Sequence, residues 1–269
     1  MLEAINETTS YIRGQTKLQP ETAIILGTGL GGIADEIEAE VIIPYERIPN
    51  FPVSTVEGHD GKMIIGTYAG KEVIVLKGRF HYYEGYTMQE VTFPVRVLKF
   101  LGVKNLFISN AAGGMNPDFE VGDVMFINDH INLMPNPLVG KHHPEYGDRF
   151  PDMSSVYNKQ LIDKALKSAT ENQLRAHKGC YVSVTGPTLE TPKEYDYFRI
   201  IGGDAVGMST VPEAIVAHQM GMTIFAVSVI TDLGVPGKIE KISHKIVQEA
   251  AAKVTPKLIR VIYEMVAGL

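Results

Sequence analysis

Residues 23–32 read AIILGTGLGG, a short apolar run that ends in a cluster of glycines. An apolar run of this length is typical of a buried strand, and glycines allow a tight turn into the next element. The same order, an apolar run followed by small or polar residues, recurs along the chain between segments of helical periodicity. This alternation predicts an α/β fold built on a buried sheet.

The pattern continues over residues 1–269 without a repeat, a low-complexity tract or a linker, which predicts a single domain. Helical periodicity covers 2–16, 87–101, 156–172, 192–201, 211–219 and 240–267, and a further helix is expected after residue 32. Apolar runs predict strands at 23–26, 63–68, 73–76, 106–109, 124–127, 180–185, 205–207 and 223–230. Thr87 and Glu90 have the spacing of a capping box, and Pro256 is expected to break the last helix. Residues 129–152, rich in Pro, His and Gly, are expected to form a long functional loop.

Composition excludes several classes of protein. The chain has 25 Lys and Arg against 31 Asp and Glu, a net charge of −6, which argues against nucleic acid or an anionic membrane as the main partner. Its single cysteine, Cys180, excludes an internal disulfide framework and a cysteine-rich zinc site. No targeting segment or membrane-length apolar run is visible in the sequence, so a cytoplasmic location is expected.

Small or polar clusters follow the predicted strands at 27–32, 78–83, 110–114, 186–191, 208–209 and 231–232. Ligands bind past the carboxyl ends of strands in sheets of this class, so we expect these clusters to line one mouth. The first cluster spells G-x-G-x-x-G, and three interpretations remain open for it. It could bind an anion through backbone N–H groups and Thr28, form a plain turn, or bind a dinucleotide. For a dinucleotide, the acidic residue expected about 20 positions later is poorly placed, since Glu46 and Asp60 lie in loop sequence.

Arg79 and His81 stand two residues apart beside Gly78, so in an extended segment their side chains point to the same side. A guanidinium offers a rigid fork to phosphate, and an imidazole can donate or carry a proton. The alternative is a surface arginine next to a half-buried histidine.

Residues 110–114 read NAAGG and permit either close ligand approach or a packing turn.

Two carboxylates follow predicted strands. Asp232 ends the most apolar strand, where burying a carboxylate without a partner is costly, so it is a candidate acid of the site. The alternative is that it forms an Asx-type turn before Gly234. Glu190 either caps a helix or accepts hydrogen bonds from a ligand edge. His142, His143 and Glu145 do not match an established metal-ligand spacing, so no metal site is expected.

Together, in this order, the clusters resemble the trimeric type of purine nucleoside phosphorylase. The resemblance covers about residues 20 to 265 and is strongest at 78–86, 110–117, 129–133, 147–154, 186–191 and 207–213. It implies one α/β domain around a distorted, partly barrel-like mixed sheet, and a ring-shaped homotrimer. It also implies phosphorolysis of purine (deoxy)nucleosides to free base and (deoxy)ribose 1-phosphate in purine salvage. Inorganic phosphate is then a co-substrate, and no cofactor is required.

The resemblance also assigns site residues. Phosphate binding falls on Thr28, where most members have Ser, and on Arg79, His81, Ala111, Ser209 and the loop residue His59. Base binding falls on Glu190, Asp232 and Leu189, the last standing where many members have an aromatic residue. Sugar binding falls on Tyr83, Met208, His244 and Tyr146, of which Tyr146 is lent by a neighbouring subunit. The residues expected to act in catalysis are Asp232, Glu190 and His81.

Asp232 departs from the pattern of the 6-oxopurine-selective members, which carry Asn at this position. An ionised Asp only accepts hydrogen bonds, which suits a 6-amino group, whereas a protonated Asp can donate to N7 or O6. Glu190 suits the N1–H and 2-amino groups of guanine. We therefore expect activity on 6-oxopurines with tolerance of 6-aminopurines. The alternatives are a methylthioadenosine phosphorylase, which carries Asp but lacks a match to Glu190, an NAD-dependent oxidoreductase, and a non-catalytic nucleoside-binding protein.

Overall fold

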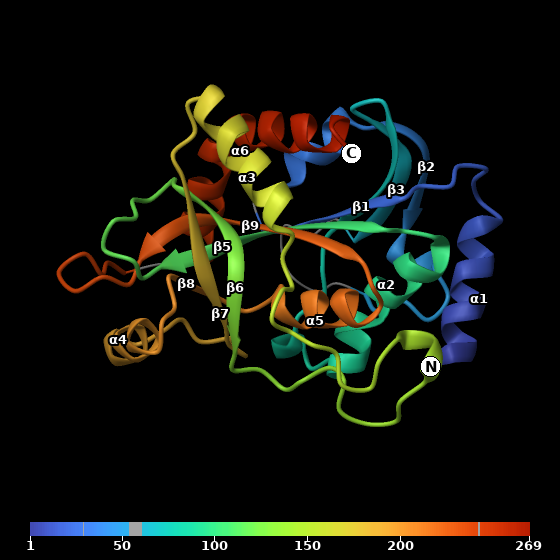
Figure 1. The fold of residues 1–269 in the computed structure, drawn as a ribbon, viewed down its shortest axis with the longest axis horizontal. Coiled ribbons are helices and arrows are strands. Elements are labelled where there is room, and N and C mark those ends of the chain that lie inside the picture. Colours follow the sequence, from blue (N-terminus) through green and yellow to red (C-terminus); the bar gives the residue numbers. More distant parts are fainter. Residues whose placement is uncertain (29, 54–60, 242) are drawn as a thin grey trace.

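The structure is a computed structural model that describes residues 1–28, 30–53, 61–241 and 243–269. Figure 1 shows a central sheet with helices on both sides. The strands are β1 Thr22–Leu26, β2 Glu38–Pro44, β3 Lys62–Tyr68, β4 Lys71–Lys77, β5 Asn105–Gly114, β6 Val124–Asn132, β7 Ala176–Ser183, β8 Ala205–Gly207 and β9 Thr223–Leu233. The α-helices are α1 Leu2–Arg13, α2 Met88–Leu101, α3 Lys159–Glu171, α4 Pro192–Ile200, α5 Val211–Gln219 and α6 His244–Ala267. The short 3₁₀ turns are η1 Gly31–Glu36, η2 Tyr45–Arg47, η3 Tyr82–Glu84 and η4 Pro144–Tyr146.

Within the described residues the strands form one mixed sheet in the order β2-β3-β4-β1-β5-β8-β7-β6-β9. A further pairing between β5 and β9 closes the second half of this sheet into a ring. β1 lies parallel between β4 and β5, while β2, β3 and β4 form an antiparallel extension. The expected α/β class and partly barrel-like mixed sheet are confirmed.

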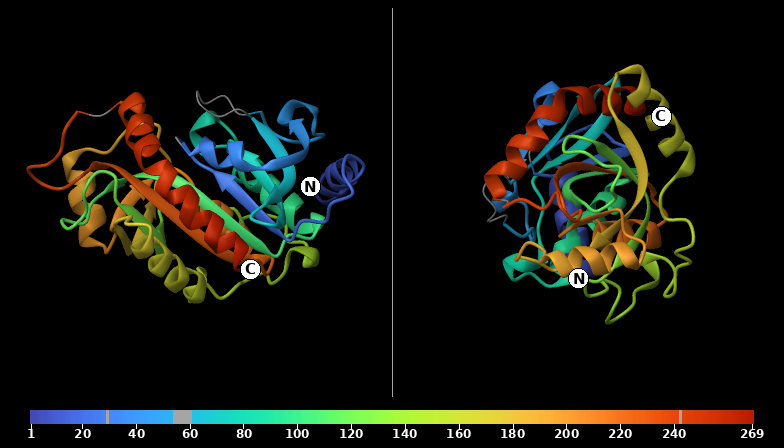
Figure 2. Two further views of the ribbon diagram at one scale, coloured as in Figure 1. Left: turned by 90° about the horizontal axis from the view of Figure 1, so that it is seen from above. Right: turned by 90° about the vertical axis from the view of Figure 1, so that its left-hand side faces the viewer.

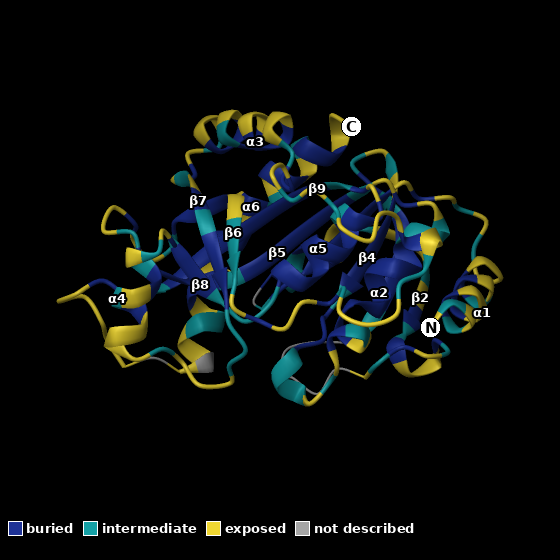
Figure 3. Cartoon of the chain, turned by 60° about the horizontal axis from the view of Figure 1, so that its bottom comes forward, coloured by how far each residue is buried: buried dark blue, intermediate teal, exposed yellow. Residues whose placement is uncertain are grey.

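Helices cover both faces of the sheet and bury its core. α3 and α6 pack against each other on one side, and α2 and α5 pack on the other (Figures 1 and 2). All residues of β1 are buried, and β9 is buried from Ile224 to Thr231. Figure 3 shows buried strands, largely buried helices α2 and α5, and exposed outer faces on α1, α3 and α4. The apolar runs of the sequence therefore form the interior, as their length and composition predict.

Local signals explain where several helices begin. Thr87 and Glu90 form the expected capping box at the start of α2, with the Glu90 N–H donating to Thr87 Oγ1 at 3.3 Å. Capping boxes also start α4 and α5. Each box satisfies backbone N–H groups that the first turn of a helix leaves without partners.

Two helix predictions are wrong. The glycine cluster is followed by the short 3₁₀ turn η1 and then by β2, which pairs antiparallel with β3. The strand–helix–parallel strand unit of a dinucleotide site is therefore not formed there. The expected break at Pro256 is also absent, because α6 continues through it. Val254 and Leu258 flank this proline and are buried against the core, so packing offsets the missing hydrogen bond.

The strand boundaries also differ from the prediction. β5 continues through the small residues 110–114, which pair with β9 and β8 rather than forming a turn. β6 extends to Asn132, so the long loop begins later than residue 129. The edge strand β2 has no predicted counterpart, because it begins with the exposed glutamates Glu38 and Glu40 and its apolar run is only three residues long before Pro44. Across the described residues, no helix combines the length and apolar character that a bilayer crossing requires.

A substitution at Phe225 tests how much the stability of the core depends on packing inside the closed ring of strands. This residue of β9 is 0% exposed, and its ring lies 5.2 Å from that of Phe107 and 5.5 Å from that of Phe126. Replacing Phe225 by Ala is expected to lower the free energy of unfolding by about 3–5 kcal/mol. Urea denaturation measures this loss. The control Phe150→Ala, at a side chain that is 88% exposed, is expected to change it by less than about 0.5 kcal/mol.

Candidate active site

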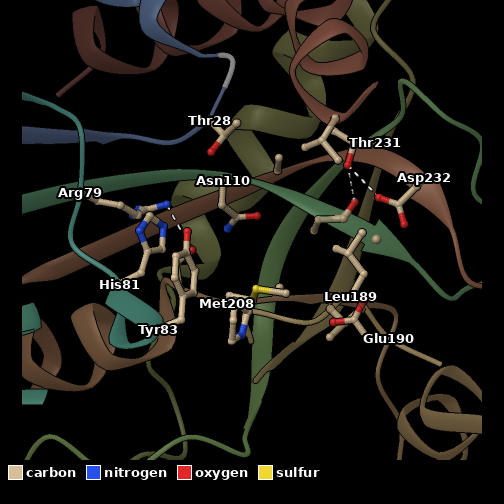
Figure 4. A pocket seen from close by; sticks show the side chains of 18 residues that line it. Thr28, Arg79, His81, Tyr83, Asn110, Leu189, Glu190, Met208, Thr231 and Asp232 are labelled. Atoms are coloured by element: carbon tan, nitrogen blue, oxygen red, sulfur yellow. Dashed lines mark hydrogen bonds between the residues drawn. The ribbon is translucent and has the colours of Figure 1, made fainter. Parts of the chain in front are cut away.

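One cavity of about 450 Å³ opens where the ends of β1, β4, β5, β8 and β9 meet (Figure 4). Its size is within the usual range for a small-molecule site. Its walls are formed by Thr28, Arg79, His81, Tyr83, Asn110, Ala111, Ala112, Gly113, Pro187, Leu189, Glu190, Val206, Gly207, Met208, Ser209, Thr231, Asp232 and Val247. The clusters that follow the predicted strands therefore share one mouth.

Arg79 is held at one end of the cavity by partners from two other segments. Its side chain is 2% exposed, and its Nε lies 3.3 Å from Oε1 of Glu213, which is 5% exposed. Its Nη1 donates to the Ser109 carbonyl at 2.9 Å and to Ser209 Oγ at 3.2 Å. Burying a guanidinium is costly unless it is paired and hydrogen-bonded. These partners therefore compensate the buried charge of Arg79 and orient its guanidinium group.

Glu213 and Ser209 are positioned by a strained turn at the start of α5. Thr210 has φ 68° and ψ −53°, and the Val211 N–H donates to the Ser209 carbonyl at 2.7 Å. This is a γ-turn with positive φ at its central residue, a rare and costly conformation for a β-branched side chain. The Thr210 N–H donates to Glu213 Oε2 at 3.0 Å, and Asn110 Nδ2 donates to Thr210 Oγ1 at 2.9 Å. These bonds hold the turn beside Arg79.

His81 lies next to Arg79 and is also buried. Its Nδ1 is 3.0 Å from Glu84 Oε1, which also accepts from the His81 backbone N–H at 2.8 Å. Its ring stacks on Tyr83, with centroids 4.7 Å apart. Burial lowers the pKa of His81, and the neighbouring Arg79 charge lowers it further, whereas the Glu84 hydrogen bond acts in the opposite direction. The bond to Glu84 orients the imidazole beside the buried guanidinium.

Two partly buried carboxyl groups, those of Glu190 and Asp232, lie at the opposite end of the cavity, with Met208 between the two ends (Figure 4). Asp232 accepts from Thr231 Oγ1 at 2.9 Å on one oxygen and from the Tyr195 hydroxyl at 3.3 Å on the other. Burial raises the pKa of Asp232 and of Glu190, and the charge of Asp232 raises that of Glu190 further. One end of the cavity is therefore cationic, and the other carries two acids that burial drives toward their protonated forms.

Between the two ends, small residues let the backbone form part of the wall. Gly27 packs so closely on β5 that a Cβ there would lie 2.5 Å from the Ser109 carbonyl oxygen. Gly113 leaves room for Asp232, since a Cβ at that position would lie 2.9 Å from its Oδ2. Among the described residues, the buried Asn110 Oδ1 has no hydrogen-bond partner, although it lines the cavity. The small residues therefore bring polar backbone and Asn110 to the surface of the cavity.

The comparisons with known proteins agree with this geometry. Residues 21–267 match the family model described as Phosphorylase superfamily. The chain belongs to this family. It is 48% identical over 268 residues to Purine nucleoside phosphorylase 1 of Bacillus subtilis (strain 168), covering 99% of both chains. It is 44% identical over 264 residues to Purine nucleoside phosphorylase of Rattus norvegicus, covering 95% of this chain and 91% of the other.

Solved structures show the same fold. Purine nucleoside phosphorylase of Schistosoma mansoni in complex with adenosine superimposes with a TM-score of 0.94 at 39% identity, covering 100% of this chain and 98% of the other. The same enzyme in complex with inosine gives a TM-score of 0.93 at 38% identity, covering 100% and 97%. The resemblance to this family that the motifs indicate is confirmed.

Most of the residues expected in the site line the cavity. These are Thr28, Arg79, His81, Ala111 and Ser209 at the cationic end, Leu189, Glu190 and Asp232 at the acidic end, and Tyr83 and Met208 between them. His59 lies outside the described residues. His244 is the first residue of α6, and its side chain is not described.

Tyr146 does not line this cavity. Its side chain is 4% exposed, and the Arg96 guanidinium lies 4.1 Å from its ring centroid, in a different hollow. Its contribution to a neighbouring subunit's site stays a prediction. The histidines 142 and 143 line that second hollow. In the part of the chain that the structure describes, no group of three or more His, Cys, Asp or Glu side chains could hold a metal ion.

Sequence reasoning missed two residues that position the site. Glu213 stands three residues after Thr210, a capping-box spacing that indicates a helix start but not an ion pair with Arg79, 134 residues away. Tyr195 lies in the predicted helix 192–201, and its spacing does not indicate that its hydroxyl reaches Asp232. Both contacts depend on how distant segments meet.

Glu213 provides a test of the buried ion pair. Glu213→Gln keeps the shape but removes the charge opposite Arg79, so we expect unfolding free energy to fall by about 3–5 kcal/mol. The control is Glu120→Gln, which breaks an exposed ion pair with Arg175 and is expected to have a much smaller effect, since solvent screens that pair. Urea denaturation of both variants checks this. Equal losses would contradict a special role for the Arg79–Glu213 pair.

Proposed function

We propose that this protein catalyses phosphorolysis of purine nucleosides and deoxynucleosides, releasing the free base and (deoxy)ribose 1-phosphate. The observation that carries this proposal is a single cavity with buried Arg79 and His81 at one end and the partly buried carboxyl groups of Glu190 and Asp232 at the other. A nucleoside with a phosphate beneath its sugar has the matching order of groups: an anion, a pentose and a polar purine edge. The family members of known structure named above are purine nucleoside phosphorylases with purine nucleosides bound.

Phosphate would occupy the cationic end. Arg79, Ser209, Thr28 and His81 supply donors there, and charge-assisted hydrogen bonds to an anion are worth about 1.5–3 kcal/mol each. The backbone N–H of Ala111 adds a further donor, and its small side chain does not obstruct the anion. Glu213 and Glu84 hold Arg79 and His81 in place before the anion arrives. The phosphate thus meets prearranged donors, and no cofactor or metal is required for this step.

Cleavage of the N-glycosidic bond would follow from the two ends of the cavity acting on one nucleoside. As the N-glycosidic bond lengthens, the sugar gains positive charge and the purine gains negative charge. The phosphate lies under the sugar, where it stabilises the cationic centre and then attacks it. The acids at the other end meet the polar edge of the purine, where a proton delivered to N7 makes the base a better leaving group.

The base end indicates which purines the site accepts. Glu190 can accept from the N1–H and 2-amino groups of a 6-oxopurine, whereas an ionised Asp232 accepts from a 6-amino group. We therefore propose activity on 6-oxopurines with tolerance of 6-aminopurines, in purine salvage. A methylthioadenosine phosphorylase is less well supported, because Glu190 lies in the base end of the cavity. The turn η1 after the glycine cluster removes the main support for an NAD-dependent oxidoreductase.

We also retain three proposals that rest on the resemblance and on the sequence. They are a homotrimer in which Tyr146 approaches a neighbouring site, sugar contacts from Tyr83, Met208 and His244, and a cytoplasmic location. His59 completes the phosphate end in this proposal.

Dependence on phosphate tests the proposed function. We expect purine release from inosine and guanosine to require added phosphate, with adenosine slower and methylthioadenosine slowest. His81→Gln, which removes a titratable donor from the phosphate end, is expected to lower kcat/KM for phosphate about 10- to 100-fold. His177→Gln is the matched control, since that histidine lines a different part of the fold beside Asp123. Purine release without phosphate, or no release from any nucleoside, would contradict the proposal.

A further inference from the structure

Tyr195 of α4 lies behind the base end of the cavity and is 2% exposed. Its hydroxyl donates to Asp232 Oδ2 at 3.3 Å. The chain makes room for this ring with a glycine, since a Cβ on Gly234 would lie 2.1 Å from the Tyr195 Cδ1 atom. A Cβ on Gly113 would lie 3.5 Å from the Tyr195 hydroxyl and 2.9 Å from Asp232 Oδ2. The ring is therefore seated against backbone, with its hydroxyl aimed at the carboxyl group.

The same hydroxyl also interacts with Glu190, the second acid of the base end. A phenol has one hydrogen to donate, so it can donate to only one of these carboxyl groups at a time. The other Asp232 oxygen accepts from Thr231. Each oxygen of Asp232 thus lies within hydrogen-bond distance of a hydroxyl, and the carboxyl group also lines the cavity.

We propose that Tyr195 is a positioning residue that sets base specificity, because its hydroxyl holds Asp232 as a hydrogen-bond acceptor toward the purine and links it to Glu190. This inference rests on the proposed phosphorolysis of purine nucleosides. An acceptor at this place matches the 6-amino group of adenosine and opposes the O6 of inosine. Without the Tyr195 hydroxyl, the buried Asp232 carries a proton over a wider pH range and can donate to O6 or N7.

Several other groups face Asp232 and contribute to its titration. Glu190 and Tyr195 face it from the loop before α4 and from α4 itself, and Thr231 precedes it on β9. A second hollow on its other side is lined by the charged residues Lys238, Glu240, Lys241, Glu249 and Lys253. The hydrogen bond from Tyr195 lowers the pKa of Asp232, in opposition to burial, which raises it. Removing the hydroxyl is therefore expected to move the titration of Asp232 to higher pH.

Tyr195→Phe tests the inference, because it removes only the hydroxyl and keeps the ring against Gly234. We expect the ratio of kcat/KM for adenosine to that for inosine to fall at least about fivefold. The apparent acid pKa in the pH profile of kcat/KM for inosine is expected to rise. Tyr197→Phe is the matched control, since that tyrosine lies on the same helix and is 52% exposed. In an Asp232→Asn background, the effect of Tyr195→Phe is expected to shrink to within about twofold.

Binding of adenine and of hypoxanthine, measured by calorimetry in the presence of phosphate, gives the same comparison without turnover. A fivefold fall in relative adenine affinity supports the inference. An unchanged or raised adenosine-to-inosine ratio in Tyr195→Phe overturns it, as does an undiminished effect in the Asp232→Asn background. These outcomes are distinct from failure of the proposed function, in which the unaltered protein releases no purine from any nucleoside in the presence of phosphate.

Discussion

The buried ion pair between Arg79 and Glu213 is the constraint on which the site depends. Arg79 follows β4, Glu213 lies in the first turn of α5, and neither side chain reaches bulk water to any extent. Because each charge is costly to bury alone, the end of the strand and the start of the helix must meet in one arrangement. The strained turn at Thr210 belongs to that arrangement and presents Ser209 to the same guanidinium.

The closed half of the sheet brings the two ends of the cavity into one space. β5 pairs with β1, β8 and β9, so residues that follow these strands lie around a common opening. Small residues along β5 let the neighbouring strands pack closely and bring the cavity up to the backbone of β5. The cationic end and the acidic end are consequently held at opposite sides of one cavity by the same strands. A reaction that separates charge along a substrate, with an anion under the sugar and a proton at the base, fits this polarity.

Much of this arrangement follows from short-range rules. Period-two alternation places Arg79 and His81 on one side of an extended segment, and both line the cavity. The Thr87–Glu90 spacing marks the start of α2, and the buried strand at 223–230 lies in β9. These predictions succeed because neighbouring residues alone determine them. The assignment of each end of the cavity to a part of the substrate comes from the family resemblance and stays a prediction.

Other features depend on contacts between distant segments and are not visible in local patterns. The glycine cluster precedes a 3₁₀ turn rather than an α-helix, because the chain then enters the edge strand β2. α6 continues through Pro256 because its buried face packs on the core. Tyr195 meets Asp232 across 37 residues, through space left by Gly234 and Gly113. Only the assembled fold shows that this tyrosine contacts Asp232 at the acidic end of the cavity.

A crystal structure of the protein with inorganic phosphate and hypoxanthine tests the central claim most directly, namely that the cationic and acidic ends receive the two parts of one substrate. The account predicts a phosphate within about 3 Å of both the Arg79 guanidinium and Ser209 Oγ, and hypoxanthine with its polar edge against Glu190 and Asp232. A phosphate bound outside this cavity, or a base bound against Arg79 with the acids facing solvent, would contradict it.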